Sequence, residues 1–171
     1  SYYTIEKFEW SPREIGYSLG FIGILMVFVQ GFLVRKVVPR VGVRWAGIIG
    51  MSATIIAFMG YAGATSSAMM YVAMIPGALG ALAGPALSSI ASGQVGAAQQ
   101  GELQGGLSSM MSLTSIVSPP IMTQTFALFS GTDHILYFPG APFFLAAILT
   151  TFSLILFIRV TSNLTIPQSV N

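Results

Sequence analysis

The sequence has 171 residues, of which 54% are hydrophobic and only 7% are charged. Because soluble domains carry about 25% charged residues, this composition excludes an ordinary water-soluble fold and indicates a chain that lies in the hydrocarbon core of a bilayer. The net charge of +2 gives no indication of a nucleic-acid partner, and a chain without cysteine has no disulfide and no thiolate metal site.

The first predicted membrane span covers residues 12–34. A bilayer crossing needs about 20 mostly apolar residues, and this stretch meets that requirement. Its start is indicated by Ser11, which caps a helix well, and by Pro12, which suits the first helical position. Glu14 stands three residues after the cap, so we expect a capping box here.

A basic loop follows and leads into the second predicted span, residues 45–64. Trp45 and Tyr61 lie near the two ends of this span, as is typical of side chains at the membrane–water interfaces. The loop holds Arg35, Lys36, Arg40 and Arg44.

The third predicted span, residues 68–92, is rich in small residues. Gly80 and Gly84 are four residues apart, a spacing that favours close contact with another helix. Pro76 and Pro85 predict kinks, since proline removes a backbone donor inside a helix.

The fourth predicted span, residues 102–129, is the most polar, and the fifth, residues 142–160, is strongly apolar. We expect Pro119 and Pro120 to break the hydrogen-bond ladder of the fourth span. Its hydroxyl and amide residues are Ser108, Ser109, Ser112, Thr114, Ser115, Ser118, Thr123, Gln124 and Thr125.

These spans predict one all-α domain, a polytopic helical bundle in an inner or plasma membrane. The positive-inside rule places the basic loop 35–44 in the cytosol. Residues 1–11 and loop 130–140 are then outside, whereas loop 93–101 and the C-terminus are inside. Because five spans is an odd number and no signal peptide precedes the outer N-terminal segment, we expect a further span upstream.

Four groups of segments suggest a family. They are Trp10-Ser11-Pro12-Arg13-Glu14-Ile15-Gly16 with Gly23-Ile24-Leu25 and Gln30-Gly31; Pro39-Arg40-Val41-Gly42-Val43-Arg44; Gln94-Val95 and Gln100-Gly101-Glu102-Leu103-Gln104-Gly105 with Ser112-Leu113-Thr114-Ser115-Ile116 and Pro119; and Gly140-Ala141-Pro142-Phe143. Together they resemble the tetracycline-efflux branch of the major facilitator superfamily over almost the whole chain. The glutamine-rich block that begins at Gln100 is the most specific of them.

The resemblance implies that residues 1–171 are helices 8 to 12, the C-terminal half of a twelve-helix transporter whose N-terminal half is absent from this chain. That branch carries a histidine in helix 8 and an aspartate in helix 9. These positions correspond to Met26 and Thr54, neither of which can carry a proton. Gln30 corresponds to a glutamine that the branch places in its substrate region.

Candidate substrate-pathway residues follow from these positions and from one face of the fourth span. Met26, Gln30 and Thr54 come from the resemblance. Ser108, Ser112 and Ser115 are spaced by three and four residues, so they share a helical face. This hydroxyl face either lines a water-filled pathway or packs against a neighbouring helix, and Gln30 either contacts substrate or bonds to another helix.

Candidate residues for a cytosolic gate are Arg40, Arg44, Glu102 and Gln104. The simpler interpretations are that the arginines set the membrane topology and that Glu102 complements the dipole of the helix it opens. No predicted span has an ionisable group near its middle, and the single histidine, His134, lies in an outer loop. If the transporter has a proton-coupling carboxylate, we expect it in the N-terminal half.

The favoured function is alternating-access transport, with efflux of a small amphipathic compound or drug. The resemblance implies that this efflux is coupled to proton antiport. An uncoupled or differently coupled facilitator or importer of another solute is the alternative. One loop histidine offers little for an enzyme, since hydrolysis usually needs a positioned base or metal. We expect no cofactor. The expected partners are the lipid bilayer, the other half of the transporter and a small-molecule substrate, and the isolated chain is not expected to transport.

Overall fold

The computed structural model describes residues 8–130 and 138–163, and within these ranges the chain is helical without strands. His134 and most of the outer N-terminal segment therefore lie outside the described residues. The elements are α2 (Pro12–Phe28), η1 (Val29–Leu33), α3 (Val34–Val41), α4 (Val43–Gly63), α5 (Ser67–Leu79), η2 (Gly80–Leu82), α6 (Ala83–Ser92), η3 (Ala97–Gln99), α7 (Gln100–Ser130) and α8 (Ala141–Ser162).

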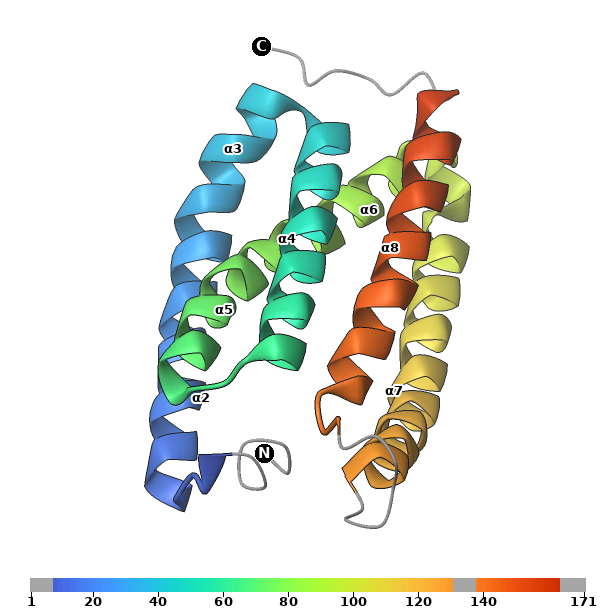
Figure 1. Ribbon diagram of the computed structural model, residues 1–171. Coiled ribbons are helices and arrows are strands. Elements are labelled where there is room, and N and C mark those ends of the chain that lie inside the picture. Colours follow the sequence, from blue (N-terminus) through green and yellow to red (C-terminus); the bar gives the residue numbers. More distant parts are fainter. Residues whose placement is uncertain (1–7, 131–137, 164–171) are drawn as a thin grey trace.

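The helices form an elongated bundle with α4 in its middle (Figure 1). The α2–α3 stretch stands on one side and α7 on the other, while α5 and α6 run obliquely behind α4. Among the described residues, four helical segments are long and apolar enough to cross a membrane: Pro12–Val41, Val43–Gly63, Ser67–Ser92 and Ala141–Ser162. They correspond to four of the five predicted spans. Helix α7 is not among the four, since its hydroxyl residues make it more polar, so its crossing stays a prediction.

The first helical stretch begins as the sequence predicts and ends later. The Ser11 hydroxyl accepts from the Glu14 backbone N–H at 3.4 Å, and the Ser11 N–H donates to Glu14 Oε2 at 2.8 Å, which confirms the capping box. The predicted loop over residues 35–44 is wrong for most of its length. Those residues continue the helix as α3, and the chain reverses only at Gly42, whose φ of 82° suits a residue without a Cβ.

A π-helical segment interrupts this first stretch at η1. The backbone N–H of Val34 bonds to the carbonyl of Val29, five residues earlier, so this turn holds one more residue than an α-turn would. This segment could not be predicted from the sequence, because a π-turn needs no special residue type.

Small residues on α4 let its neighbours approach closely. A Cβ added to Gly50 would lie 2.7 Å from the backbone nitrogen of Ala83, and one on Gly60 would lie 2.8 Å from the Cβ of Ala73. Ala53 and Ala57 are buried between these positions. This contact fixes α4 against α5 and α6 through van der Waals packing, which is the main attraction between helices in a membrane.

Only one glycine of the predicted pair in the third span makes a close contact with another helix in the described chain. Gly80 lies against the hydroxyl of Thr54 on α4, whereas nothing lies within 4 Å of the place where a Cβ on Gly84 would sit. The kinks expected at Pro76 and Pro85 stay predictions: α5 runs through Pro76, and the 3₁₀ turn η2 separates α5 from α6. Pro85 has no N–H for the carbonyl of Ala81, which lies in this turn.

The fourth predicted span forms one helix of 31 residues that runs through Pro119 and Pro120. The helix thus continues past this pair, while its hydrogen-bond ladder is interrupted there, as the sequence predicts. The two prolines withhold N–H donors from the carbonyls four residues earlier, those of Ser115 and Ile116. Most side chains of α7 are exposed, since its main described neighbour is α8.

The N-terminal residues are tied to the start of α5. The Trp10 indole Nε1 donates to Ser67 Oγ at 2.8 Å, and its ring stacks on Tyr71 with centroids 5.7 Å apart. Trp10 is only 5% exposed. This contact fixes the entry of α2 beside the turn between α4 and α5.

We predict that Gly50→Ala destabilises the full-length protein and that Gly84→Ala does not. The Gly50 methyl would meet the backbone of Ala83, which cannot move like a flexible side chain, so we expect a loss of about 1–3 kcal/mol. Gly84 is open, and alanine there gains helix propensity of up to about 1 kcal/mol. Denaturant unfolding of both variants in detergent measures this, and equal stability of the two would contradict the packing described here.

Candidate functional site

Gln30 lies inside the π-helical segment η1, and its side chain is exposed. Met26, one turn earlier on α2, is 42% exposed. Between them, Val29 is buried against Ala78 and Leu82. Single π-turns within α-helices occur frequently at functional sites, so the position of Gln30 favours its role as a pathway residue.

Thr54 has a different environment from Met26 and Gln30. Its hydroxyl donates to the carbonyl of Gly50 at 2.9 Å, and it lies against Gly80 in the contact between α4 and η2. The structure therefore gives Thr54 a packing contact, and a contact with substrate stays a prediction.

The hydroxyl face of α7 is exposed along its length. Ser115 donates to the carbonyl of Met111 at 2.9 Å, as Ser109 and Thr114 do to carbonyls one turn earlier. Ser108 and Ser112 differ from these, because their hydroxyls have no hydrogen-bond partner within the described part of the chain. Like the hydroxyls of Ser118 and Thr123, they remain available to water, substrate or another part of the protein.

The two groups of pathway candidates lie on opposite sides of the described bundle. Met26 and Gln30 are on the α2–η1 stretch, and Ser108, Ser112 and Ser115 are on α7 (Figure 1). This chain alone does not bring them together. A pathway lined by both groups therefore requires further protein between or beside these two helices.

The candidate gate residues lie at the ends of α3, α4 and α7. Arg40 is exposed in the last turn of α3, and Glu102 and Gln104 are exposed at the start of α7. Arg44 is half-buried, and its Nε donates to Thr161 Oγ1 on α8 at 3.2 Å rather than to a carboxylate. This bond joins the start of α4 to the end of α8.

Gln100 was not singled out by its own chemistry in the sequence, although it opens the glutamine-rich block. Its side-chain nitrogen donates to the carbonyls of Ser92, at 2.8 Å, and Val95, at 3.4 Å. It thereby satisfies carbonyls at the end of α6 and in the following turn. The bonds fix the connection between α6 and α7 at the proposed cytosolic mouth.

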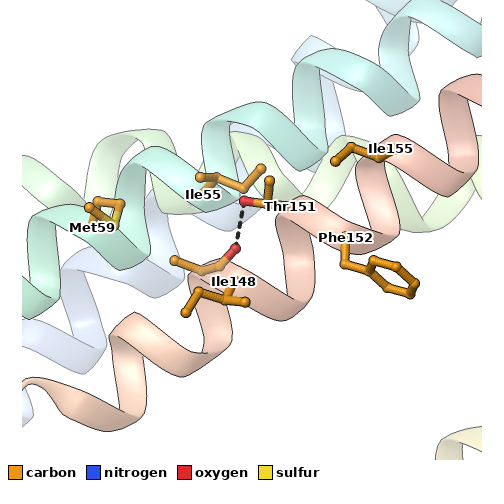
Figure 2. Close-up of a pocket in the computed structure, with 7 residues that line it drawn as sticks. Ile55, Met59, Ile148, Thr151, Phe152 and Ile155 are labelled. Atoms are coloured by element: carbon orange, nitrogen blue, oxygen red, sulfur yellow. Dashed lines mark hydrogen bonds between the residues drawn. The ribbon is translucent and has the colours of Figure 1, made fainter.

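A hollow lies between α4 and α8 (Figure 2). It is an apolar groove of about 320 Å³ lined by Ile55, Met59, Ala147, Ile148, Thr151, Phe152 and Ile155. The Thr151 hydroxyl donates to the carbonyl of Ala147 at 2.7 Å, so the one polar lining side chain is satisfied within α8. The sequence patterns used above do not reveal this groove, because it depends on how two apolar helices meet.

Long apolar helices packed through small residues define this chain as part of an integral, multi-pass membrane protein. The family model described as Major Facilitator Superfamily matches residues 1–169. The chain belongs to this superfamily, whose members are transporters.

Several curated relatives are named as tetracycline resistance proteins. The chain is 36% identical over 144 residues to the tetracycline resistance protein, class C, of Escherichia coli, which covers 84% of this chain and 36% of that protein. It is 33% identical over 130 residues to the class G protein of Vibrio anguillarum, covering 76% of this chain and 32% of the relative. No solved structure matches the chain.

A more distant relative has a different name. The human hippocampus abundant transcript 1 protein is 24% identical over 190 residues, which cover 98% of this chain and 39% of that protein. The chain thus spans about a third of the length of the curated relatives it matches. This third of the length includes the hydroxyl face of α7 and the π segment of the α2–α3 stretch.

Proposed function

We propose that the complete protein is a secondary transporter, rather than an enzyme, that exports a small amphipathic compound by alternating access. Membership of the superfamily supports transport. The relatives named as tetracycline resistance proteins support export as the direction of transport and a drug as the class of substrate. The residues of this chain support a polar pathway beside α7 and η1.

The observation that carries this proposal is a set of unpaired hydroxyls on α7, among them those of Ser108 and Ser112. A hydroxyl without a hydrogen-bond partner is costly in hydrocarbon, by about 4–8 kcal/mol on an alkane scale. Ser108 and Ser112 are exposed without a partner in the described chain. Their face is therefore better suited to water, substrate or further protein than to lipid tails.

The resemblance to helices 8 to 12 supplies the rest of the arrangement. We assign this chain to the C-terminal half of the transporter, with the remaining half packed against the exposed faces of α2 and α7. Midplane binding between two halves is the usual arrangement in such transporters. In this arrangement Met26 and Gln30 line the pathway with the hydroxyl face, while Arg40, Arg44, Glu102 and Gln104 border its cytosolic mouth.

The orientation follows from the basic residues at one end of the bundle. Arg35, Lys36, Arg40 and Arg44 lie on α3 and at the start of α4, and Arg159 lies in the last turn of α8. The positive-inside rule places this end in the cytosol, so the C-terminus is cytosolic and residues 1–11 are outside.

Labelling tests this orientation, because the chain itself has no cysteine. We predict that Thr65→Cys, in the exposed turn between α4 and α5, reacts with a membrane-impermeant maleimide on intact cells. Gln99→Cys, in the exposed η3 turn, should react only after permeabilisation. Both substitutions belong in a full-length background without other cysteines. The reverse pattern would overturn the orientation.

Substitution of Gln30 tests its role in the pathway. We predict that Gln30→Ala lowers kcat/KM for transport of tetracycline by the full-length protein about tenfold, since a lost bond to a bound compound costs about 1–1.5 kcal/mol. Val27→Ala is the matched control, because Val27 is exposed on the same helix and lacks a polar group. Measured in proteoliposomes, equal effects of both changes would remove Gln30 from the pathway.

An uncoupled facilitator is the second candidate, and one observation favours it. The positions that correspond to the titratable residues of the tetracycline-efflux branch are Met26 and Thr54, and α4, α5 and α6 contain no acidic residue or histidine. Any proton-coupling group of this protein therefore lies in another part of it.

An imposed pH gradient separates the two candidates. If the protein is an antiporter, substrate accumulation in proteoliposomes rises with the gradient and collapses when a protonophore is added. We expect this coupled behaviour, and we expect Met26→Leu to retain it because Met26 carries no proton. Transport that ignores the gradient would favour the facilitator.

A further inference from the structure

Two arginines lie beyond the groove, at the basic end of α4 and α8. Arg44 lies eleven residues before Ile55 on α4, and Arg159 lies eleven residues after Ile148 on α8. Eleven residues are about three helical turns, so each arginine lies on nearly the same helical face as its groove residue. Both arginines are at the same end, where the bond from Arg44 to Thr161 joins the two helices.

The spacing matches the depth of one membrane leaflet. Eleven helical residues rise about 16 Å, and half of the hydrocarbon core of a bilayer is about 15 Å. With the arginines at the membrane surface, the groove lies near the middle of the bilayer. Trp45 follows Arg44 in the sequence and is 59% exposed. Tryptophan is typical of the membrane–water interface, which agrees with arginines at the membrane surface.

The charges at this end are uncompensated by the two helices that carry them. Neither Val43–Gly63 nor Ala141–Ser162 contains an aspartate or glutamate. Arg44 uses Nε for Thr161, which leaves its Nη groups to bind a ligand, and Arg159 is exposed. Guanidinium groups bind phosphate oxygens with two donors at once.

We propose that α4 and α8 form a binding site for an anionic phospholipid of the leaflet next to the basic end. Its phosphate binds Arg44 and Arg159, and one acyl chain follows the seam into the groove lined by Ile55, Ile148 and Phe152. An apolar groove together with the two cationic side chains Arg44 and Arg159 favours an anionic lipid over an uncharged compound or a zwitterionic lipid. The proposal does not depend on which compound the protein transports.

Lipid titration of the purified full-length protein in detergent, followed by native mass spectrometry, tests this site. We expect phosphatidylglycerol to bind at least about fivefold more tightly than phosphatidylcholine with the same acyl chains. The double variant Arg44→Gln/Arg159→Gln should lose this preference, with an affinity for phosphatidylglycerol about tenfold lower. Arg159→Gln alone should lower it about threefold, and because Arg159 is exposed this variant is expected to fold.

Two further variants separate the site from general surface charge and from the transport pathway. Arg35→Gln/Lys36→Gln removes the same charge from α3, and it should keep the preference for phosphatidylglycerol. Ile148→Trp fills the groove, and it should weaken binding of both lipids without removing the preference. Equal binding of both lipids by the unaltered protein, or equal losses in the two double variants, would overturn the proposal. Because binding is measured without transport, a failure of the efflux proposal would not affect this result.

Discussion

The close contact of α4 with α5 and α6 is the constraint on which the rest of the described bundle depends. Lipid tails solvate leucine as well as a protein core does, so helices in a membrane are held together by close packing rather than by exclusion of water. Gly50 and Gly60 allow backbones to approach where any Cβ would collide. Once α4 is fixed in this way, α8 packs on another of its faces, where the ring of Phe157 lies against Gly47.

Helices α2 and α7 have much less of their surface covered by the described chain than α4 has. The exposed polar candidates lie on them or directly beside them: Gln30 in η1, which follows α2, and the hydroxyl face with Ser108 and Ser112 on α7. In the proposed transporter, these faces are the ones that the other half would cover. The well-packed part of the bundle would then serve as a support for the helices that carry the candidate residues.

The sequence predicted what depends on local chemistry. Ser11 and Glu14 indicated the start of α2, and the apolar runs indicated the long helices. It did not predict which glycine of the pair at 80 and 84 is in contact, because that depends on the rotation of the helix against α4. The groove at Ile148 was not predicted for the same reason, because it depends on how α4 and α8 pack against each other. The roles of the pathway and gate residues remain proposals because the fold of this chain alone does not assemble them.

The π segment at Val29–Leu33 decides which way the basic end of the first helix faces. Val29 is buried, and in an uninterrupted α-helix Lys36, seven residues later, would return to nearly the same face. The extra residue in the π-turn rotates everything beyond it by about 100°, so Val34 and Val38 pack against the cluster around Val29 instead. Lys36 and Arg40 are consequently exposed. One additional residue in a single turn thus lets this helical stretch pack its apolar side chains against the bundle on both sides of η1, while Lys36 and Arg40 face away from it.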